Sequence, residues 1–126
     1  NHIHLIIKSA ENKIQDIIRD FKKFTSKEII KEIETTNESK KVWMLNKFSF
    51  EANRIKRGVK YKFWKDGFHP IILDNTKLLE QKLDYIHLNP VISGFVEEAE
   101  HWKNSSAKAY ALDIKNACNL NIEFIR

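Results

Sequence analysis

The sequence is poor in residues that cross-link a chain or interrupt regular structure. Its 126 residues include one Cys, two Pro and three Gly. A single cysteine cannot form a disulfide within the chain, so a reducing compartment is expected. With so little Gly and Pro, long flexible linkers are not expected. The length suits one domain with one core and is short for two, so residues 1–126 are interpreted as a single domain.

Long apolar runs are also missing. No run approaches the roughly 20 residues that a membrane-spanning helix needs, so no membrane partner is expected. Hydrophobic residues make up 42% of the chain, which is typical of a folded protein. Lys and Arg number 22 against 17 Asp and Glu, a formal net charge of +5. This excess favours a polyanionic partner, although many basic proteins bind no nucleic acid.

Hydrophobic periodicity predicts a strand and then helices in the first half of the chain. Residues 2–8 are short, β-branched and apolar, and predict a strand. Residues 10–34 predict a helix, because Ile14, Ile17, Ile18, Phe21 and Phe24 recur at spacings of three and four. Residues 25–28 have the form of a capping box, which either restarts a second helix or lies inside one long helix. Residues 40–56 predict a further helix.

The second half predicts more strands around one helix. Residues 59–73 are interpreted as a strand, a Gly-containing turn and a second strand. Asp74 or Asn75 is expected to cap a helix over residues 76–89, which Pro90 ends. Residues 91–112 predict a loop and a short helix, and residues 120–125 a last strand. This order indicates an α+β domain with helices covering one antiparallel sheet.

Two histidines lie near the start of the first predicted strand. Side chains at i and i+2 of a strand share a face, so His2 and His4 would stand side by side. Two neutral imidazoles in this arrangement can bind one divalent metal ion. The alternative is a pair of exposed histidines without a ligand. Because two ligands make a weak site, a third ligand is expected from elsewhere.

The helix predicted over residues 76–89 carries two polar groups suited to such a site. Tyr85 and Asn89 are four residues apart and therefore share a face. The amide oxygen of Asn89 is a hard ligand, suited to Mg²⁺ or Mn²⁺, and the phenol of Tyr85 is a candidate nucleophile. Alternatively, Asn89 only closes the helix and Tyr85 packs at a surface groove. His87 projects towards the apolar side of this helix and is expected to pack there. Ser105 and Ser106 are expected to cap a helix or contact phosphate.

Five segments together resemble one family. They are "NHIHLII", "IRDFKKFTSKEI", "KYKFWKDGFHPI", "LDYIHLNPVISGFV" and "WKNSSAKAY", spread over residues 1–110. This set resembles the single-tyrosine HUH transposases, named for a His, hydrophobic residue, His motif, and most of all their REP-associated branch. The HUH element alone is a weak signal, whereas "YIHLNPV" followed by "SSA" is a strong one.

The resemblance implies a ferredoxin-like α+β fold, with helices packed on a central antiparallel sheet. It implies that His2, His4 and Asn89 bind Mg²⁺ or Mn²⁺ and that Tyr85 is the nucleophile. Other single-tyrosine relatives carry Gln where Asn89 stands, and Asn favours the REP-associated branch. Family members carry a strand before the HUH motif, where this sequence begins. We therefore expect a catalytic domain that is truncated at its N-terminus relative to the family.

The activity implied by the resemblance is DNA transposition. It consists of endonuclease cleavage and strand transfer on single-stranded, hairpin-bearing DNA through a 5′-phosphotyrosine intermediate. The expected location is the bacterial cytoplasm, in association with the nucleoid. A monomer is expected, with a homodimer as the alternative. Basic and aromatic residues that could line the DNA path are Lys22, Lys23, Arg54, Lys56, Arg57, Lys60, Lys62 and Trp64.

Alternative interpretations stay open for these residues and for the whole chain. The basic residues can form a solvated surface, and the aromatic ones a core. If residues 59–73 alternate as a strand, Trp64 shares the basic face, with Tyr61 and Phe63 on the other. A truncated or domesticated relative would grip hairpin DNA without cutting it. An unrelated metal-binding or RNA-binding domain is a third interpretation.

Overall fold

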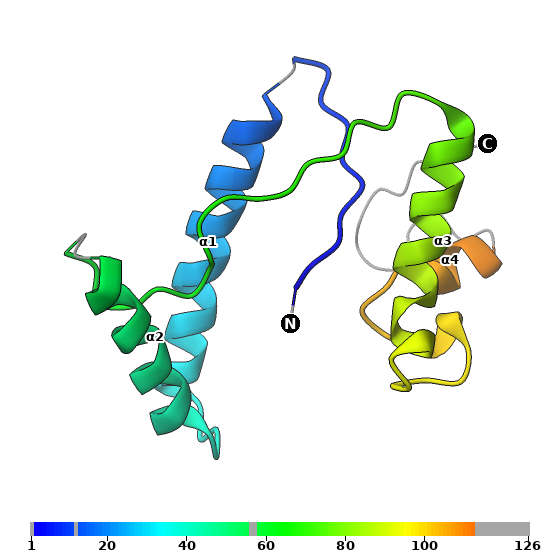
Figure 1. Cartoon of the computed structure of the whole chain (residues 1–126). Helices are drawn as coiled ribbons and strands as arrows, with labels where there is room; N and C mark the ends of the chain where they lie inside the picture. Colours follow the sequence, from blue (N-terminus) through cyan, green and yellow to red (C-terminus); the bar gives the residue numbers. More distant parts are fainter. Residues whose placement is uncertain (1, 12, 56–57, 113–126) are drawn as a thin grey trace. The chain divides into compact units, whose positions relative to one another are not determined.

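The computed structural model describes residues 2–11, 13–55 and 58–112, and their regular structure is helical (Figure 1). The chain forms two compact units: unit 1 comprises Asn1–Ile6 and Ile71–Arg126, and unit 2 comprises Ile7–Pro70. The interpretation of residues 1–126 as a single domain stays a prediction. None of the described helices combines the length and apolarity that crossing a membrane requires. In chain order the elements are α1 (Ile14–Thr35), α2 (Lys41–Ile55), α3 (Thr76–Ile92), the 3-10 helix η1 (Ala99–His101) and α4 (Ala107–Ala111).

The expected α+β, ferredoxin-like fold with a central antiparallel sheet is wrong for the described residues, which contain no strand. Residues 2–8 and 59–73, interpreted as strands, are irregular. A strand needs a neighbouring segment to complete its hydrogen-bond ladder, and a residue pattern does not supply that neighbour. The Lys62 amide instead donates to the Phe48 carbonyl of α2 at 3.0 Å. The strand predicted over residues 120–125 lies outside the described residues.

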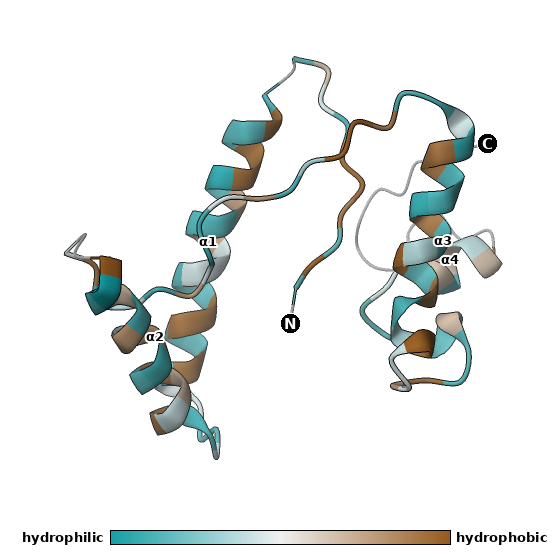
Figure 2. Ribbon diagram, viewed as in Figure 1, coloured by the Kyte–Doolittle hydropathy of each residue, from teal (hydrophilic) through white to brown (hydrophobic). Residues whose placement is uncertain are grey.

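Residues 25–28 were expected either to start a second helix or to lie inside one long helix. Helix α1 confirms the second alternative, because it runs through them without a break. The Thr25 hydroxyl donates to the Phe21 carbonyl at 2.7 Å, a bond within the helix, and so does not cap a second one. Polar and apolar residues alternate along α1 (Figure 2). The apolar stripe is narrower than predicted, since Ile17 and Phe24 are 42% and 67% exposed.

Helix α2 confirms the second predicted helix and packs against α1. The connection between them is short, and α2 returns alongside α1 as an antiparallel pair (Figure 1). Ala52 of α2 is only 2% exposed and belongs to the core of unit 2. On the same helix, the Phe48 ring meets the Phe63 ring edge-on with 5.2 Å between centres. Unit 2 is therefore a helical pair with the segment after α2 laid against it.

Helix α3 confirms one predicted boundary and corrects the other. The Asn75 side chain accepts a hydrogen bond from the Leu78 amide at 2.8 Å, so Asn75 is the N-cap. Pro90 was expected to end the helix, but α3 continues to Ile92. Pro90 lies in the last turn, where its missing N–H removes a single helical hydrogen bond. Its carbonyl accepts from the Phe95 amide at 2.9 Å, which closes the helix end.

Gly94 terminates this helix in the left-handed region, with φ of +72°. We expect Gly94→Ala to lower the free energy of unfolding by about 1 kcal/mol, because a Cβ disfavours this conformation. Nothing lies within 4 Å of the added Cβ, so the cost is purely conformational. Urea unfolding followed by circular dichroism measures it, with Ser93→Ala as the control. An unchanged midpoint for Gly94→Ala would contradict this role.

Residues 91–112 of unit 1 contain the predicted loop and short helix. Both α3 and α4 contact η1. Ala107 and Ala109 of α4 are 5% and 0% exposed, which places α4 in the small core of unit 1. The Phe95 and Trp102 rings pack with centres 5.7 Å apart. These contacts hold the chain after α3 close to the helix that carries Tyr85.

Candidate active site around Tyr85

Unit 1 brings three of the four predicted active-site side chains together. The rings of His2 and His4 have centres 5.4 Å apart, with 67° between their planes. The His4 ring meets the Tyr85 ring edge-to-face, with centres 5.5 Å apart and 89° between planes. The first residues of the chain thus lie against α3, although they do not form the predicted strand.

This cluster is exposed to solvent. His2 and His4 are both exposed, and Tyr85 is 49% exposed. Their apolar neighbours Ile3 and Leu5 are also about half exposed, at 52% and 51%. The phenol and both imidazoles can therefore be reached from solvent.

Asn89 lies one turn beyond Tyr85 on α3 and is half-buried. Its backbone carbonyl accepts a hydrogen bond from the Ser93 amide at 3.0 Å, which keeps the residue in the last turn. Because four residues make about one helical turn, its side chain is placed on the Tyr85 side of α3. Its assignment as the third metal ligand stays a prediction.

The donor set fits a divalent ion of the Mg²⁺ or Mn²⁺ type. Two neutral imidazoles can bind one divalent ion, and an amide oxygen is a hard ligand suited to Mg²⁺ or Mn²⁺. Within residues 2–11, 13–55 and 58–112, no three His, Cys, Asp or Glu side chains form a metal-binding group. The third ligand expected from the resemblance is an amide oxygen, that of Asn89.

His87 of α3 packs against the segment that contains α4, in agreement with its predicted structural role. Its Nε2 lies 2.9 Å from the Ser106 hydroxyl, and its ring meets the Tyr110 ring edge-on at 5.2 Å. The neighbouring Ser105 hydroxyl accepts a hydrogen bond from the Ala107 amide at 3.2 Å, close to the predicted capping role. The sequence reading missed the His87–Ser106 contact, because no local signal links residues 19 positions apart.

Burial lowers the pKa of His87 below its ordinary value of 6.5, against an opposing effect of Asp84. The unfolded chain therefore binds a proton at this position more readily than the folded protein. The free energy of unfolding then rises with pH through this range, and the contribution is lost as pH falls below 6.5. We expect His87→Gln to remove this part of the pH dependence. Urea unfolding at about pH 8 and about pH 5.5 tests this; equal pH dependence in both proteins would contradict it.

The predicted DNA-path residues that the structure describes all lie in unit 2, and several are engaged in internal contacts. The Lys22 ammonium donates to the carbonyls of Lys65 at 3.0 Å and Gly67 at 2.5 Å. The Lys62 side chain is 17% exposed and pairs with Asp66 at 2.7 Å. The side chains of these two lysines therefore bind groups within residues 65–67. Because both ammonium groups already have partners there, they are poorly placed to bind a phosphate.

Trp64 is likewise part of the packing of unit 2. Its indole N–H donates to the Thr25 hydroxyl at 2.9 Å. Its ring centre lies 6.1 Å from that of Phe21 and 5.0 Å from that of Phe63. The expectation that Trp64 and Phe63 lie on opposite faces of a strand is therefore wrong, because both rings join one aromatic cluster.

The remaining basic residues are more accessible. Lys23 is exposed. Arg54 is 65% exposed and lies 3.3 Å from Glu51, and Lys60 is 75% exposed and lies 3.3 Å from Glu34. Exposed pairs of this kind are weak and can exchange partners. Lys56 and Arg57 lie outside the described residues.

No family model matches the chain, and it has no match among curated proteins or solved structures.

Proposed function

We propose that this protein is a metal-dependent DNA endonuclease and strand transferase of the HUH transposase type, with Tyr85 as its nucleophile. The observation that carries the proposal is the contact of Tyr85 with His4, beside His2. An exposed phenol and two exposed imidazoles from distant parts of the sequence meet at one place. Those are the groups that a tyrosine nucleophile and a metal ion acting on a phosphodiester require.

The proposed reaction exchanges one phosphate ester for another. The Tyr85 phenol oxygen attacks phosphorus and loses its proton, and the bond from phosphorus to the DNA 3′ oxygen breaks. That oxygen takes up a proton and leaves as a free 3′-hydroxyl. The DNA on the other side remains attached as a 5′-phosphotyrosine. A second 3′-hydroxyl can reverse the step and join a new strand without ATP.

His2, His4 and Asn89 would hold the divalent ion. When bound, Mg²⁺ or Mn²⁺ supplies positive charge that stabilises the developing charge on the phosphate oxygens. The edge-to-face contact of His4 also limits rotation of the Tyr85 ring and so orients the phenol.

The test is formation of a covalent protein–DNA adduct. Labelled single-stranded DNA from a panel of hairpins is incubated with the protein and Mg²⁺ or Mn²⁺, and the products are separated on a denaturing gel. We expect a shifted band that resists denaturant, requires metal and is lost in His4→Ala. Binding without an adduct across the panel would replace this proposal with a hairpin-binding module. Failure to bind any DNA would reject both.

A further inference from the structure

We infer that the exposed face of α2 is a binding surface for single-stranded nucleic acid. At 3.6 residues per turn, positions 43, 46, 47, 50, 53 and 54 fall within one side of the helix. All six residues are exposed, and Val42, at the margin of this side, is the one other exposed residue of α2. We call this side the α2 outer face; its residues are Trp43, Asn46, Lys47, Phe50, Asn53 and Arg54.

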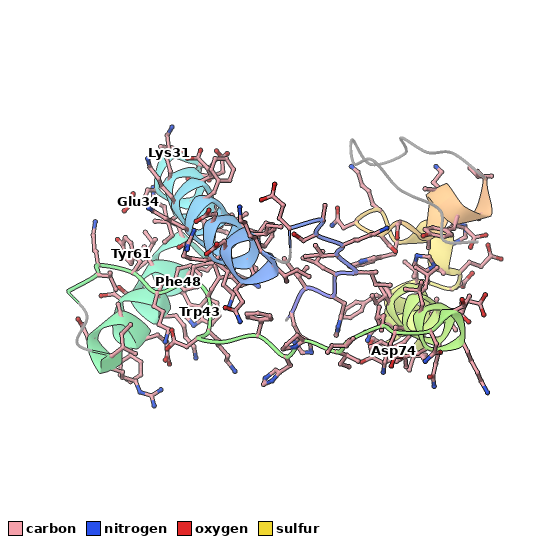
Figure 3. The ribbon with its side chains drawn as sticks, turned by 90° about the horizontal axis from the view of Figure 1, so that it is seen from above. Lys31, Glu34, Trp43, Phe48, Tyr61 and Asp74 are labelled. Carbon is pink, nitrogen blue, oxygen red and sulfur yellow. The ribbon has the colours of Figure 1, made fainter. Side chains whose placement is uncertain are left out.

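Two large aromatic rings on this face are available for stacking. Trp43 is 64% exposed and Phe50 is 63% exposed. They lie two turns apart on one line of the helix, about 10 Å along its axis. Phe48, by contrast, is half-buried and contacts Phe63; Trp43 and Phe48 are both marked on α2 in Figure 3. Exposed rings of this kind stack on bases with little dependence on sequence.

A cation follows each ring by one turn. Lys47 comes four residues after Trp43, and Arg54 four residues after Phe50. At this spacing each cation shares its side of the helix with a ring. The α2 outer face therefore repeats one unit, a ring for a base and a cation for its phosphate.

Charge decides between nucleic acid and a second protein as the occupant. The outer face contains no acidic residue, and its two asparagines add hydrogen-bonding groups. Glu51, the one acid within α2, is half-buried and lies 3.3 Å from Arg54. An exposed pair of this type is worth little, so a phosphate can replace Glu51. Cations beside both rings favour a polyanion over an apolar protein surface, which would leave them desolvated and unpaired.

This inference stands apart from the proposed chemistry. Helix α2 belongs to unit 2, whereas Tyr85 belongs to unit 1. Binding at the α2 outer face needs neither metal nor a nucleophile. It also differs from the predicted DNA path, which lacked Trp43, Lys47 and Phe50 and gave the stacking role to Trp64.

The test is the affinity of the full chain for fluorescein-labelled oligothymidylate in EDTA, measured by fluorescence anisotropy. We expect Trp43→Ala and Phe50→Ala each to raise Kd roughly tenfold, because each removes one stacked base. Lys47→Ala is expected to weaken binding and to reduce the slope of log K against log salt by about 0.7. Phe24→Ala is the matched control, since Phe24 is an equally exposed ring on α1 at 67%; its Kd should stay within about twofold.

Further measurements make the result decisive. Trp43→Phe keeps a stacking ring and should restore most of the affinity, and far-ultraviolet circular dichroism checks that each variant is folded. The assay contains EDTA and so excludes any metal-dependent reaction, which separates this surface from the proposed reaction. Unchanged Kd in the Trp43→Ala/Phe50→Ala variant would overturn the inference. If that variant instead converts a dimer into a monomer with Kd unchanged, the face joins two copies of the chain and the inference is wrong.

Discussion

Tyr85→Phe is expected to abolish the covalent protein–DNA adduct while leaving DNA binding intact. The substitution removes only the attacking oxygen and keeps the ring that meets His4 at 5.5 Å. Because Tyr85 is 49% exposed, the change in the free energy of unfolding should stay within about 0.5 kcal/mol. A complete loss of adduct from a folded protein that still binds DNA would therefore identify the nucleophile.

The chain contains its own controls for this experiment. It has three tyrosines, and the other two are Tyr61 and Tyr110. Tyr61→Phe and Tyr110→Phe should both form adduct with the hairpin that the unaltered protein cleaves. Mass spectrometry of a digested adduct should place the nucleotide on the peptide containing Tyr85. An adduct that persists in Tyr85→Phe, or maps to another tyrosine, would contradict the mechanism.

Trp64→Ala is expected to lower the free energy of unfolding of unit 2 by about 2–4 kcal/mol. The substitution removes the ring that packs against Phe21 and Phe63. It also leaves the Thr25 hydroxyl without its indole donor. Trp64 is half-buried, so the cost should fall short of that for a fully buried tryptophan. The same change is expected to weaken the packing of residues 65–67, whose carbonyls accept hydrogen bonds from Lys22.

Urea unfolding followed by far-ultraviolet circular dichroism measures this effect. Trp43→Ala is the matched control, because Trp43 is 64% exposed and should shift the free energy of unfolding by no more than about 0.5 kcal/mol. The two tryptophans are expected to behave in opposite ways. Trp64→Ala is expected to weaken the fold, and Trp43→Ala is expected to weaken nucleic-acid binding. A Trp64→Ala variant with unchanged stability and weakened DNA binding would return Trp64 to its predicted role in base stacking.

Most of the helical structure was predictable from local sequence. The apolar periodicity of residues 10–34 and the less regular pattern of residues 40–56 placed both helices near their observed bounds. The N-cap at Asn75 was one of two predicted residues, and its side chain makes the expected bond to the Leu78 amide. Such features are local, because a helix makes its backbone hydrogen bonds and its caps within a few residues.

The candidate site was predictable in its residue types and only partly in its geometry. The i, i+2 spacing of His2 and His4 and the i, i+4 spacing of Tyr85 and Asn89 indicated two pairs. Only the folded chain brings the His4 ring to Tyr85. The contact of His87 with Ser106 had no signal in the sequence.

The sequence by itself determined where helices form, two candidates for the N-cap of α3 and the chemical groups available for a site. The tertiary structure decided what the extended segments do. Residues 59–73 have a pattern typical of strands, but Phe63 and Trp64 pack on α1 and α2, and the Lys62 amide bonds to α2. The physical reason is the range of the interactions. Helical hydrogen bonds close within one turn, whereas a strand depends on a distant segment that no local pattern specifies.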